Sequence, residues 1–262
     1  MDKSLRTNQI IGMLDRKLKL GIISIVVIGV LIISIVTLPP LFEKWKGWYK
    51  YTLGGEVVFT DIELNICEFE NAEINIHFTN DPSIVFQLDY LANNIDDLSV
   101  TSYSRGVTNY SIIGNSEIEI LDITLTNDII YEINIGESTN LTTTITYDEN
   151  SLMDMGYFSY KVQGGTLDII MTEETNFVGE NVSIISVWFS EEPDIVNLDI
   201  ALHENVGGYA FFSYTESIDL SIDGWYVGMT ADGKYPDYAT TQRSGYQLAI
   251  YILCDLISGS LS

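Results

Sequence analysis

The sequence has few basic residues and few of the residue types that build catalytic or disulfide-rich sites. It contains 12 Lys and Arg against 37 Asp and Glu, which gives a formal net charge of −25. Because nucleic-acid phosphates are bound mainly by Lys and Arg, this balance argues against a nucleic-acid-binding protein. Two cysteines and two histidines in 262 residues exclude a small disulfide-held protein and leave little material for a zinc site. The signatures H-E-x-x-H, G-x-S-x-G and G-x-x-x-x-G-K-[ST] are also absent from the sequence.

Charge is distributed unevenly along the chain, and one long segment has none. Residues 1–50 hold eight of the twelve basic residues and only three acids, whereas residues 51–262 hold four basic residues and 34 acids. The stretch 20–38 has no charged residue in 19 positions, and a helix of that length reaches roughly 28 Å, close to the hydrocarbon thickness of a bilayer. Pro39 and Pro40 would end such a helix. We therefore predict a single transmembrane helix over residues 20–38.

The residues on each side of this segment predict its orientation. Five Lys and Arg precede it, against three in the first dozen residues after it, so the positive-inside rule places the N-terminus in the cytoplasm. Trp45, Trp48, Tyr49 and Tyr51 follow where an aromatic belt would lie at the membrane surface. A cleaved signal peptide and a pilin-like leader are the alternatives, and the double proline argues against both, which leaves a signal anchor in the plasma membrane. The predicted parts are a cytoplasmic basic segment 1–19, the transmembrane helix 20–38, a juxtamembrane linker 39–55 and an extracytoplasmic acidic β domain 56–262.

The part after residue 56 shows the period of strands rather than of helices. Apolar residues recur at every second position, for example over 62–66, 84–90 and 246–252. Such alternation in segments rich in Ile, Val, Thr and Tyr is typical of half-buried strands, and no window of a dozen residues keeps a helical period. The predicted fold class is all-β: an N-terminal transmembrane helix followed by an extracytoplasmic β-sandwich or irregular β-solenoid. The residue between two apolar positions is often acidic, which predicts an acidic outer surface.

Two segments share a pattern with a known group of surface proteins. Residues 121–171 combine apolar-acid-apolar strands with turns, and the tail 246–262 ends in Gly259-Ser260-Leu261. These segments resemble the putative-adhesin domain families of bacteria and archaea, whose domains tend to close with a "GSI"-like strand. The resemblance implies a sandwich or solenoid-like surface domain. It implies no catalytic residues.

Calcium is the ion that this acidic surface favours, because hard cations take oxygen ligands. Aspartates gather among glycine-containing turns in one segment, although their spacing does not match the twelve-residue EF-hand loop. The candidate calcium ligands are Asp219, Asp223, Asp232 and Asp237. Diffuse screening by counter-ions is the alternative.

The stretch 225–251 is rich in aromatic residues interleaved with Asp, Thr and Gln. Aromatic faces beside amide and carboxylate groups can hold sugars, and tyrosine-rich loops can anchor a protein partner. The candidate ligand-binding residues are Trp225, Tyr226, Tyr235 and Tyr238. The alternative is that Trp225 and Tyr226 cover the core, while Tyr246 and Tyr251 are ordinary strand residues.

The predicted outside location permits two kinds of covalent modification. Cys67 and Cys254 are the only cysteines, and an even count in an oxidising compartment allows them to pair, with two buried thiols as the alternative. The Asn-x-Ser/Thr sequences at Asn109, Asn140 and Asn181 are acceptors of N-glycans where the host has that machinery.

The leading hypothesis is a single-span cell-surface β protein that acts by contact, in adhesion or envelope structure, without catalysis. The second is an extracytoplasmic module that binds a glycan or calcium through residues 219–251. A hydrolase that uses acid pairs such as Asp96-Asp97 ranks third, because 34 acids in the outer part produce such pairs by chance. The expected partners are the lipid bilayer and a surface glycan or protein, and no cofactor beyond calcium is expected.

Overall fold

A computed structural model of the chain describes residues 46–54, 61–104, 108–153, 156–178, 182–192, 194–213, 215–229, 236–240 and 247–262. The chain divides into two units, Met1–Trp45 and Lys46–Ser262, and all described residues belong to the second. The predicted basic segment 1–19 and transmembrane helix 20–38 therefore lie outside the described residues. Within the described part, no helix is long and apolar enough to cross a bilayer.

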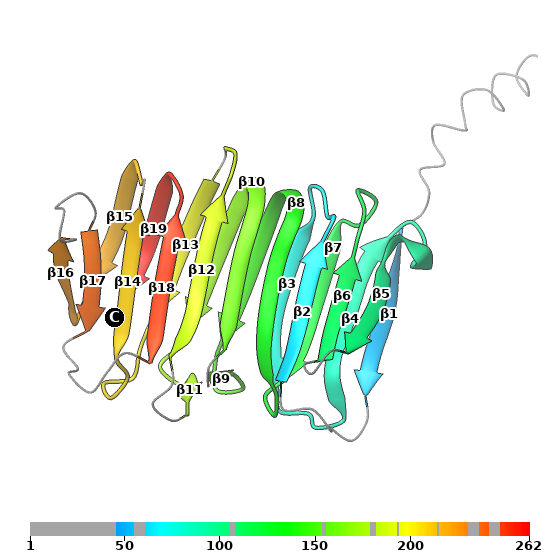
Figure 1. Ribbon diagram of the computed structural model, residues 1–262, viewed down its shortest axis with the longest axis horizontal. Helices are drawn as coiled ribbons and strands as arrows, with labels where there is room; N and C mark the ends of the chain where they lie inside the picture. The colour runs from blue at the N-terminus through cyan, green and yellow to red at the C-terminus, as the bar shows by residue number, and fades with distance from the viewer. Residues whose placement is uncertain are drawn as a thin grey trace, which may run out of the picture. The chain divides into compact units, whose positions relative to one another are not determined.

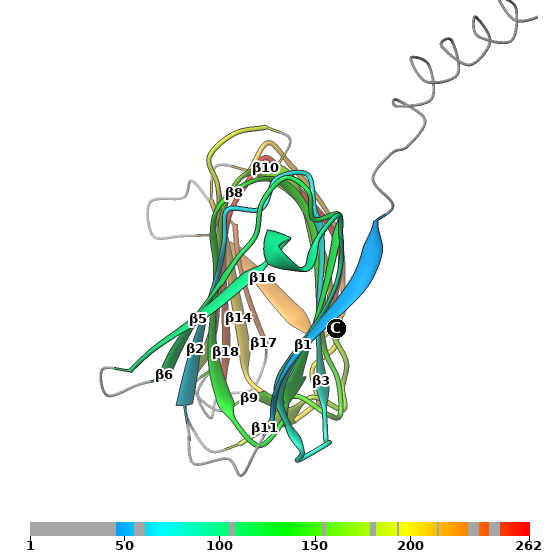
Figure 2. The same cartoon turned by 90° about the vertical axis from the view of Figure 1, so that its right-hand side faces the viewer.

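Most of the described residues lie in strands, so the prediction of an all-β fold is confirmed. The strands form two facing layers, which Figure 2 shows from one end. The first layer contains, in spatial order, β5 (Ser99–Ser104), β6 (Thr108–Ile113), β2 (Asp61–Cys67), the first half of β8 (Ile130–Tyr147), the first half of β10 (Tyr157–Met171), β12 (Ser183–Phe189), β18 (Leu248–Leu253), β14 (Gly208–Ser213), β17 (Pro236–Thr240) and β16 (Trp225–Met229). The second layer contains β1 (Gly47–Gly54), β4 (Ile84–Ala92), β7 (Ile120–Thr126), β3 (Glu73–Thr79), the second halves of β8 and β10, β13 (Asp194–Ile200), β19 (Leu256–Leu261) and β15 (Ser217–Ile222). Two short strands, β9 (Leu152–Met153) and β11 (Asn176–Phe177), pair separately, and Ile95–Asp97 form a 3-10 turn.

Each central level of the structure, here called a rung, has one strand in each layer and pairs in parallel with the next rung. Strands β8 and β10 supply both layers themselves, because each turns a corner halfway along. The arrangement therefore has the facing layers of a sandwich and the stacked rungs of a solenoid (Figure 1). The rungs do not stack in chain order: β18 and β19, the last strands, insert between β12/β13 and β14/β15. The C-terminal strands are thus needed to join the last rung to the rest.

The corners are shaped by residues in left-handed backbone conformations. Asn71 and Asn140 have φ values of 54° and 51°, and their side chains are hydrogen-bonded, with Nδ2 of Asn140 donating to Oδ1 of Asn71 at 2.7 Å. Asparagine tolerates this conformation better than most residues. At the corner of β10, Gly165 has a φ of 129°, and a Cβ there would lie 2.1 Å from the carbonyl oxygen of Leu141. Only glycine fits at that corner.

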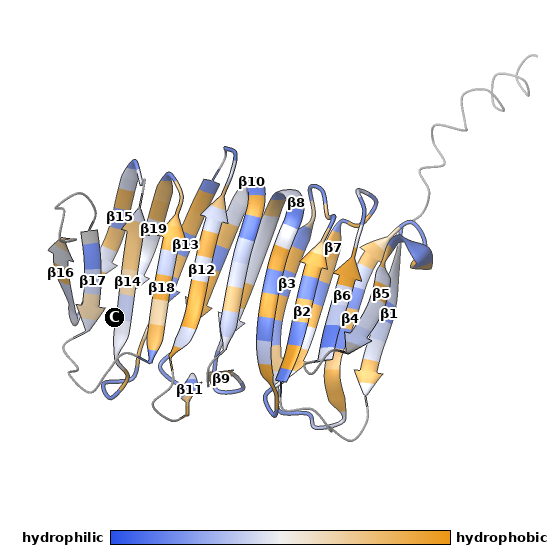
Figure 3. Ribbon diagram, viewed as in Figure 1, coloured by the Kyte–Doolittle hydropathy of each residue, from blue (hydrophilic) through white to orange (hydrophobic). Residues whose placement is uncertain are grey.

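The core lies between the layers and is formed by every second residue of each strand. The inward side chains are apolar and almost completely buried, as Leu64, Ile133 and Val196 illustrate. Figure 3 shows the resulting alternation of hydrophobic and hydrophilic bands along the strands. Burying one such side chain stabilises the fold by about 1.5–3 kcal/mol. Burial of these alternating apolar residues is therefore a main source of the stability of the folded unit.

The β unit begins earlier than the sequence analysis placed it. Residues 47–54, within the stretch 39–55 expected to be a linker, form β1 and pair antiparallel with β4. Two of the aromatic residues assigned to a membrane belt pack against the core instead: the ring centroids of Tyr49 and Tyr90 are 5.6 Å apart, and those of Tyr51 and Phe86 are 6.0 Å apart. The segment alternates inward and outward residues like the other strands. Its aromatic residues and its place in the sequence soon after the predicted helix 20–38 favoured the membrane interpretation.

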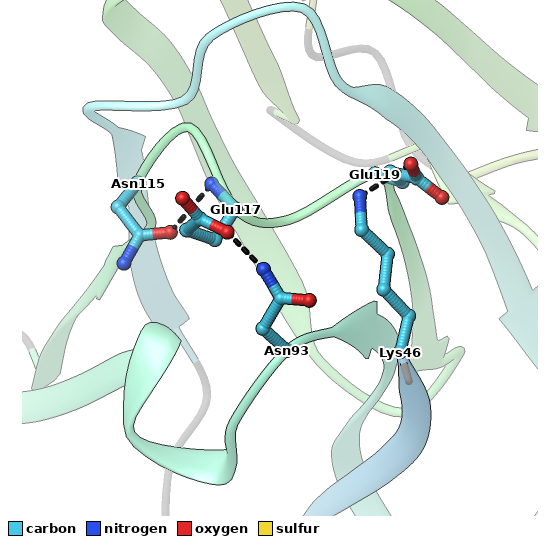
Figure 4. A network of polar contacts seen from close by, with 5 residues as sticks. All are labelled: Lys46, Asn93, Asn115, Glu117 and Glu119. Carbon is cyan, nitrogen blue, oxygen red and sulfur yellow. Dashed lines mark hydrogen bonds and ion pairs between the residues drawn. The ribbon is translucent and has the colours of Figure 1, made fainter. Parts of the chain in front are cut away.

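Polar side chains join the start of β1 to the neighbouring turns. The Nζ atom of Lys46 contacts the carboxylate of Glu119, which immediately precedes β7 (Figure 4). Close by, the side-chain amide of Asn93 donates to the carboxylate of Glu117, whose backbone N–H donates to Oδ1 of Asn115 at 2.9 Å. These contacts hold β1 and the loops after β4 and β6 together at one end of the unit.

Candidate functional site

The outer surface of the second layer is a polar array whose groups are bonded to one another. The side-chain amide of Asn197 donates to Asp168 at 2.6 Å, and the hydroxyl of Ser260 donates to Asp199 at 2.6 Å. Together with Ser258 these residues line a shallow depression. The hydrogen-bond donors and acceptors of this array are already bonded to one another. We therefore interpret it as an ordinary solvated surface rather than a ligand site.

The outer surface of the first layer is different, because aromatic side chains gather on its C-terminal half. They come from strands β12, β18, β14 and β16, at positions that alternate with inward core residues. Trp188 is 54% exposed and Tyr251 is 42% exposed. We call this group the outer aromatic face, and its members are Trp188, Tyr209, Phe211, Tyr226 and Tyr251.

Sheet register brings these residues together. Phe211 and Tyr251 are direct partners on β14 and β18, and the rings of Tyr209 and Tyr251 lie edge to face with centroids 6.2 Å apart. Trp188 lies one strand away on β12, beside Leu253. Tyr226 is in the same row as Tyr209, with Ala239 of β17 between them. Neighbouring strands are about 4.8 Å apart, so the face is a broad and shallow platform of rings.

Polar groups lie among and around these rings. Ser186 is the register partner of Tyr251, and Asp237 is the register partner of Phe211. On the other side, Lys161 is the partner of Trp188. Half-exposed rings bordered by a hydroxyl, a carboxylate and an ammonium group can bind a partner by ring contact and fix its orientation by hydrogen bonds.

The structure separates the four aromatic residues that the sequence analysis proposed as ligand-binding. Tyr226 belongs to the outer aromatic face, whereas Trp225 and Tyr238 are buried and contribute to the core. Tyr235 lies outside the described residues. Trp225 and Tyr238 face inward, because consecutive strand residues point to opposite sides and the inward side at this end is the core.

The four candidate calcium ligands are not brought together among the described residues. Asp219 lies on β15 in the second layer, Asp223 lies in the turn after it, and Asp237 lies on β17 in the first layer. Asp232 lies outside the described residues. No group of three His, Cys, Asp or Glu side chains in the described part of the chain is close enough to hold a metal ion. Asp219 and Asp237 could not share an ion, because they belong to different layers.

The two cysteines are free thiols in the structure, as in the second of the two alternatives that the sequence left open. Cys67 ends β2 and Cys254 follows β18, and β8, β10 and β12 lie between those strands. Four interstrand spacings amount to roughly 19 Å, whereas a disulfide needs Cα atoms within about 7 Å. Burial raises the pKa of the Cys254 thiol to about 12, and burial followed by the charges of Glu68 and Glu137 raises the pKa of Cys67.

The candidate glycosylation sites differ in their surroundings. Asn140 is exposed at a corner, but its side-chain nitrogen, the atom that would carry a glycan, donates to Asn71. Asn109 lies within β6 and is half-buried. Asn181 lies outside the described residues. Glycosylation at Asn140 would have to break the corner hydrogen bond.

Sequence reasoning missed Trp188, Tyr209 and Phe211 as surface residues; Tyr251 lies in the aromatic stretch 225–251 but is not among the predicted ligand-binding residues. The signal was present, because Trp188 stands between the core residues Val187 and Phe189, which predicts that it faces outward. The sequence does not show that β12, β18 and β14 lie side by side, because this order depends on the insertion of β18 and β19 between earlier rungs.

The comparisons with known proteins support the fold alone. No protein-family model and no curated protein matches this sequence. Among solved structures, the chain is similar to a "putative cell adhesion protein" from Clostridium sporogenes ATCC 15579, with a TM-score of 0.54 and 9% sequence identity. The likeness covers 82% of this chain and 97% of the other. The resemblance to adhesin-like domains therefore agrees with the structure at the level of the fold.

Proposed function

We propose that this protein acts by contact at the cell surface, in adhesion or in envelope structure, and that the outer aromatic face is its contact surface. The observation that carries the proposal is the exposure of Trp188 and Tyr251 on the neighbouring strands β12 and β18, with Tyr209 and Phe211 beside Tyr251 on β14. Large exposed aromatic clusters mark interaction sites, and Trp and Tyr supply much of the binding energy in known interfaces.

The proposed role includes the location predicted from the sequence. A helix over residues 20–38 would hold the β unit at the outer side of the plasma membrane, with the N-terminus in the cytoplasm. The acidic composition of the unit suits this placement, because dense negative charge keeps a surface protein soluble and discourages nucleic-acid binding. No catalysis and no cofactor are part of the proposal.

The second candidate is a glycan-binding module, and the outer aromatic face also supports it. Flat rings bordered by Ser186 and Asp237 offer stacking surfaces together with hydrogen-bonding groups, as a carbohydrate requires. In this candidate the binding site is the outer aromatic face, which includes β12, and not the segment 219–251 alone. It needs no calcium, since the candidate aspartates are separated.

The test is an adhesion assay on cells that produce the full-length protein at equal surface levels. Trp188→Ala and Tyr251→Ala are expected to reduce adhesion to envelope material or to immobilised polysaccharides at least about tenfold in apparent affinity. The matched controls are Trp48→Ala and Tyr103→Ala, which remove one exposed Trp and one exposed Tyr far from the face and should leave adhesion unchanged. A loss confined to polysaccharide surfaces would select the glycan module. Equal adhesion by all four variants would refute the outer aromatic face as the contact surface.

A further inference from the structure

The second layer ends in two strands that each have one paired side. Among the described strands, β1 pairs only with β4, and β15 pairs only with β19. They lie at opposite ends of the long axis of the unit (Figure 1). The outer edge of such a strand presents backbone N–H and C=O groups to another strand.

The two edge strands run in the same direction. Strand β1 is antiparallel to β4, which is antiparallel to β7, so β1 is parallel to β7. From β7 through β3, β8, β10, β13 and β19 to β15 every pairing is parallel. If one unit follows another along the axis in the same orientation, β15 of the first meets β1 of the second in parallel, which continues the pattern of the layer.

The inward side chains of both edge strands are incompletely covered. In the middle of the layer, inward residues such as Leu198 and Ile257 are fully buried. The corresponding residues of the edge strands are apolar but only half-buried, although they pack against the core; they are Tyr49, Tyr51 and Leu53 on β1, and Ile218, Leu220 and Ile222 on β15. Contact between the two edges would bury this remaining apolar surface.

The two edges also differ in charge. The described residues of the unit include three Lys and Arg residues, and two of them, Lys46 and Lys50, lie just before or within β1. The described segment 215–224 around β15 contains three acids and no basic residue. Lys50 is 3.9 Å from Asp89 but its side chain remains 56% exposed, so it can contact a second carboxylate on its open side.

A single row of outward residues joins the two edges. Lys50 is the register partner of Asp89, and Asp219 is the register partner of Ser258 at the opposite end. The complete row, in spatial order, is Lys50, Asp89, Asp122, Asn75, Thr144, Asp168, Asn197, Ser258 and Asp219. Continuing this register into a following copy places Lys50 of that copy beside Asp219 of the preceding one.

We propose that the unit Lys46–Ser262 associates head to tail with further copies of itself, the β15 edge of one copy pairing in parallel with the β1 edge of the next. This contact is heterologous, so it leaves a free β1 at one end and a free β15 at the other and generates an open row of copies. The alternative symmetric contacts are electrostatically unfavourable, because β1 against β1 brings lysines together and β15 against β15 brings aspartates together. The proposal is independent of the outer aromatic face, which belongs to the other layer.

Two single-cysteine proteins test the pairing of unlike edges. The unit 46–262 contains its own hydrophobic core and can be prepared alone, with Cys67→Ser and Cys254→Ala as the background. One protein then carries Lys50→Cys and the other Asp219→Cys. A thiol oxidant is expected to give a cross-linked dimer in the mixture and little in either protein alone. Cross-linking of the Lys50→Cys protein with itself at an equal or greater yield would overturn the proposal, since it would indicate a β1–β1 contact.

Charge reversal provides the second readout, by sedimentation over a range of concentrations. Lys50→Glu is expected to weaken association at least about threefold, and adding Asp219→Lys to the same chain should restore it, because the pair is then reversed rather than broken. The control is Asp219→Lys alone, which should weaken association as Lys50→Glu does, because each single reversal places like charges at the contact and only the double reversal restores an opposite pair. A unit that stays monomeric at every concentration, or that associates equally in all variants, would overturn the proposal while leaving the adhesion assay unaffected.

Discussion

Trp225 and Tyr226 are consecutive residues of β16, yet Trp225 is 7% exposed and Tyr226 is 66% exposed. The two side chains point to opposite sides of the strand. Trp225 packs over the start of β14 so closely that a Cβ on Gly208 would lie 2.5 Å from its ring. One residue therefore closes the core at this end of the unit, and the other belongs to the outer aromatic face.

Replacing these two residues should change the stability of the unit by very different amounts. Trp225→Ala is expected to lower the free energy of unfolding by about 2–4 kcal/mol, because it leaves a cavity between β14 and β16. Tyr226→Ala should change it by no more than about 0.5 kcal/mol, since the side chain is exposed. Chemical denaturation of residues 46–262 measures both values. Equal destabilisation by the two substitutions would contradict the assignment of opposite faces.

A glycine in the last strand is required by the close approach of its neighbour. Gly259 has a φ of 121°, and a Cβ there would lie 1.7 Å from the carbonyl oxygen of Leu198. Gly259→Ala must move β19 away from β13, so we expect a loss of at least about 2 kcal/mol of stability. Gly224→Ala is the matched control: its φ is 75° but nothing lies within 4 Å of the added Cβ, so it should cost only about 1 kcal/mol. Similar thermal unfolding of the two variants would show that the contact with Leu198 is not tight.

The separation of the cysteines predicts their chemistry. Native protein purified without reductant should contain no internal disulfide, and its unfolding curve should not change when reductant is added. Both thiols should be alkylated slowly at neutral pH because their pKa values are raised, with Cys254 slower than Cys67 because it is buried. Mass spectrometry of alkylated protein, native and unfolded, measures this. An internal bridge between the two in intact protein would contradict the strand order from β2 to β18.

Alternation along the sequence predicts most of the fold, since it identifies strands and the inward face of each. It identifies Leu64, Ile133 and Val196 as core residues without knowledge of their neighbours. It cannot give the order of the rungs, because every rung has the same pattern of inward apolar residues. The insertion of β18 and β19 between earlier rungs depends on which stripes fit best in three dimensions.

The candidate site was harder to predict than the fold for the same reason. Trp188 and Tyr251 are 63 positions apart in the chain and become neighbours through the pairing of β12 with β18. The residues predicted from the sequence to form the site are instead close to one another in the chain. That grouping joined Trp225 with Tyr226 and Asp219 with Asp237, pairs that the structure places on different faces.

The start of β13 predicts a pH dependence of stability. Asp194 lies against the turn before β19, where Oδ2 accepts a hydrogen bond from the backbone N–H of Asp255 at 3.1 Å. Burial, and next the charge of Asp255, raises the pKa of Asp194 above its ordinary value of 3.8. A carboxyl group with a raised pKa in the folded state binds more protons there than in the unfolded state, so its contribution to stability is complete below about pH 3.8 and is lost as the pH rises through the higher folded value.

Asp194→Asn should remove this loss. The amide oxygen can still accept from Asp255, but the repulsion between the two carboxylates is gone, so the variant is expected to be more stable than the wild type at pH 7 by less than about 1 kcal/mol, because solvent screens a pair this exposed. Below pH 3.8 the two proteins should unfold alike. Glu192→Gln serves as the control, since it removes one charge from an exposed position of the same acidic unit and measures the relief of general repulsion alone. If the two variants gain equal stability across denaturation curves from pH 3 to pH 8, the interaction between Asp194 and Asp255 has no specific effect.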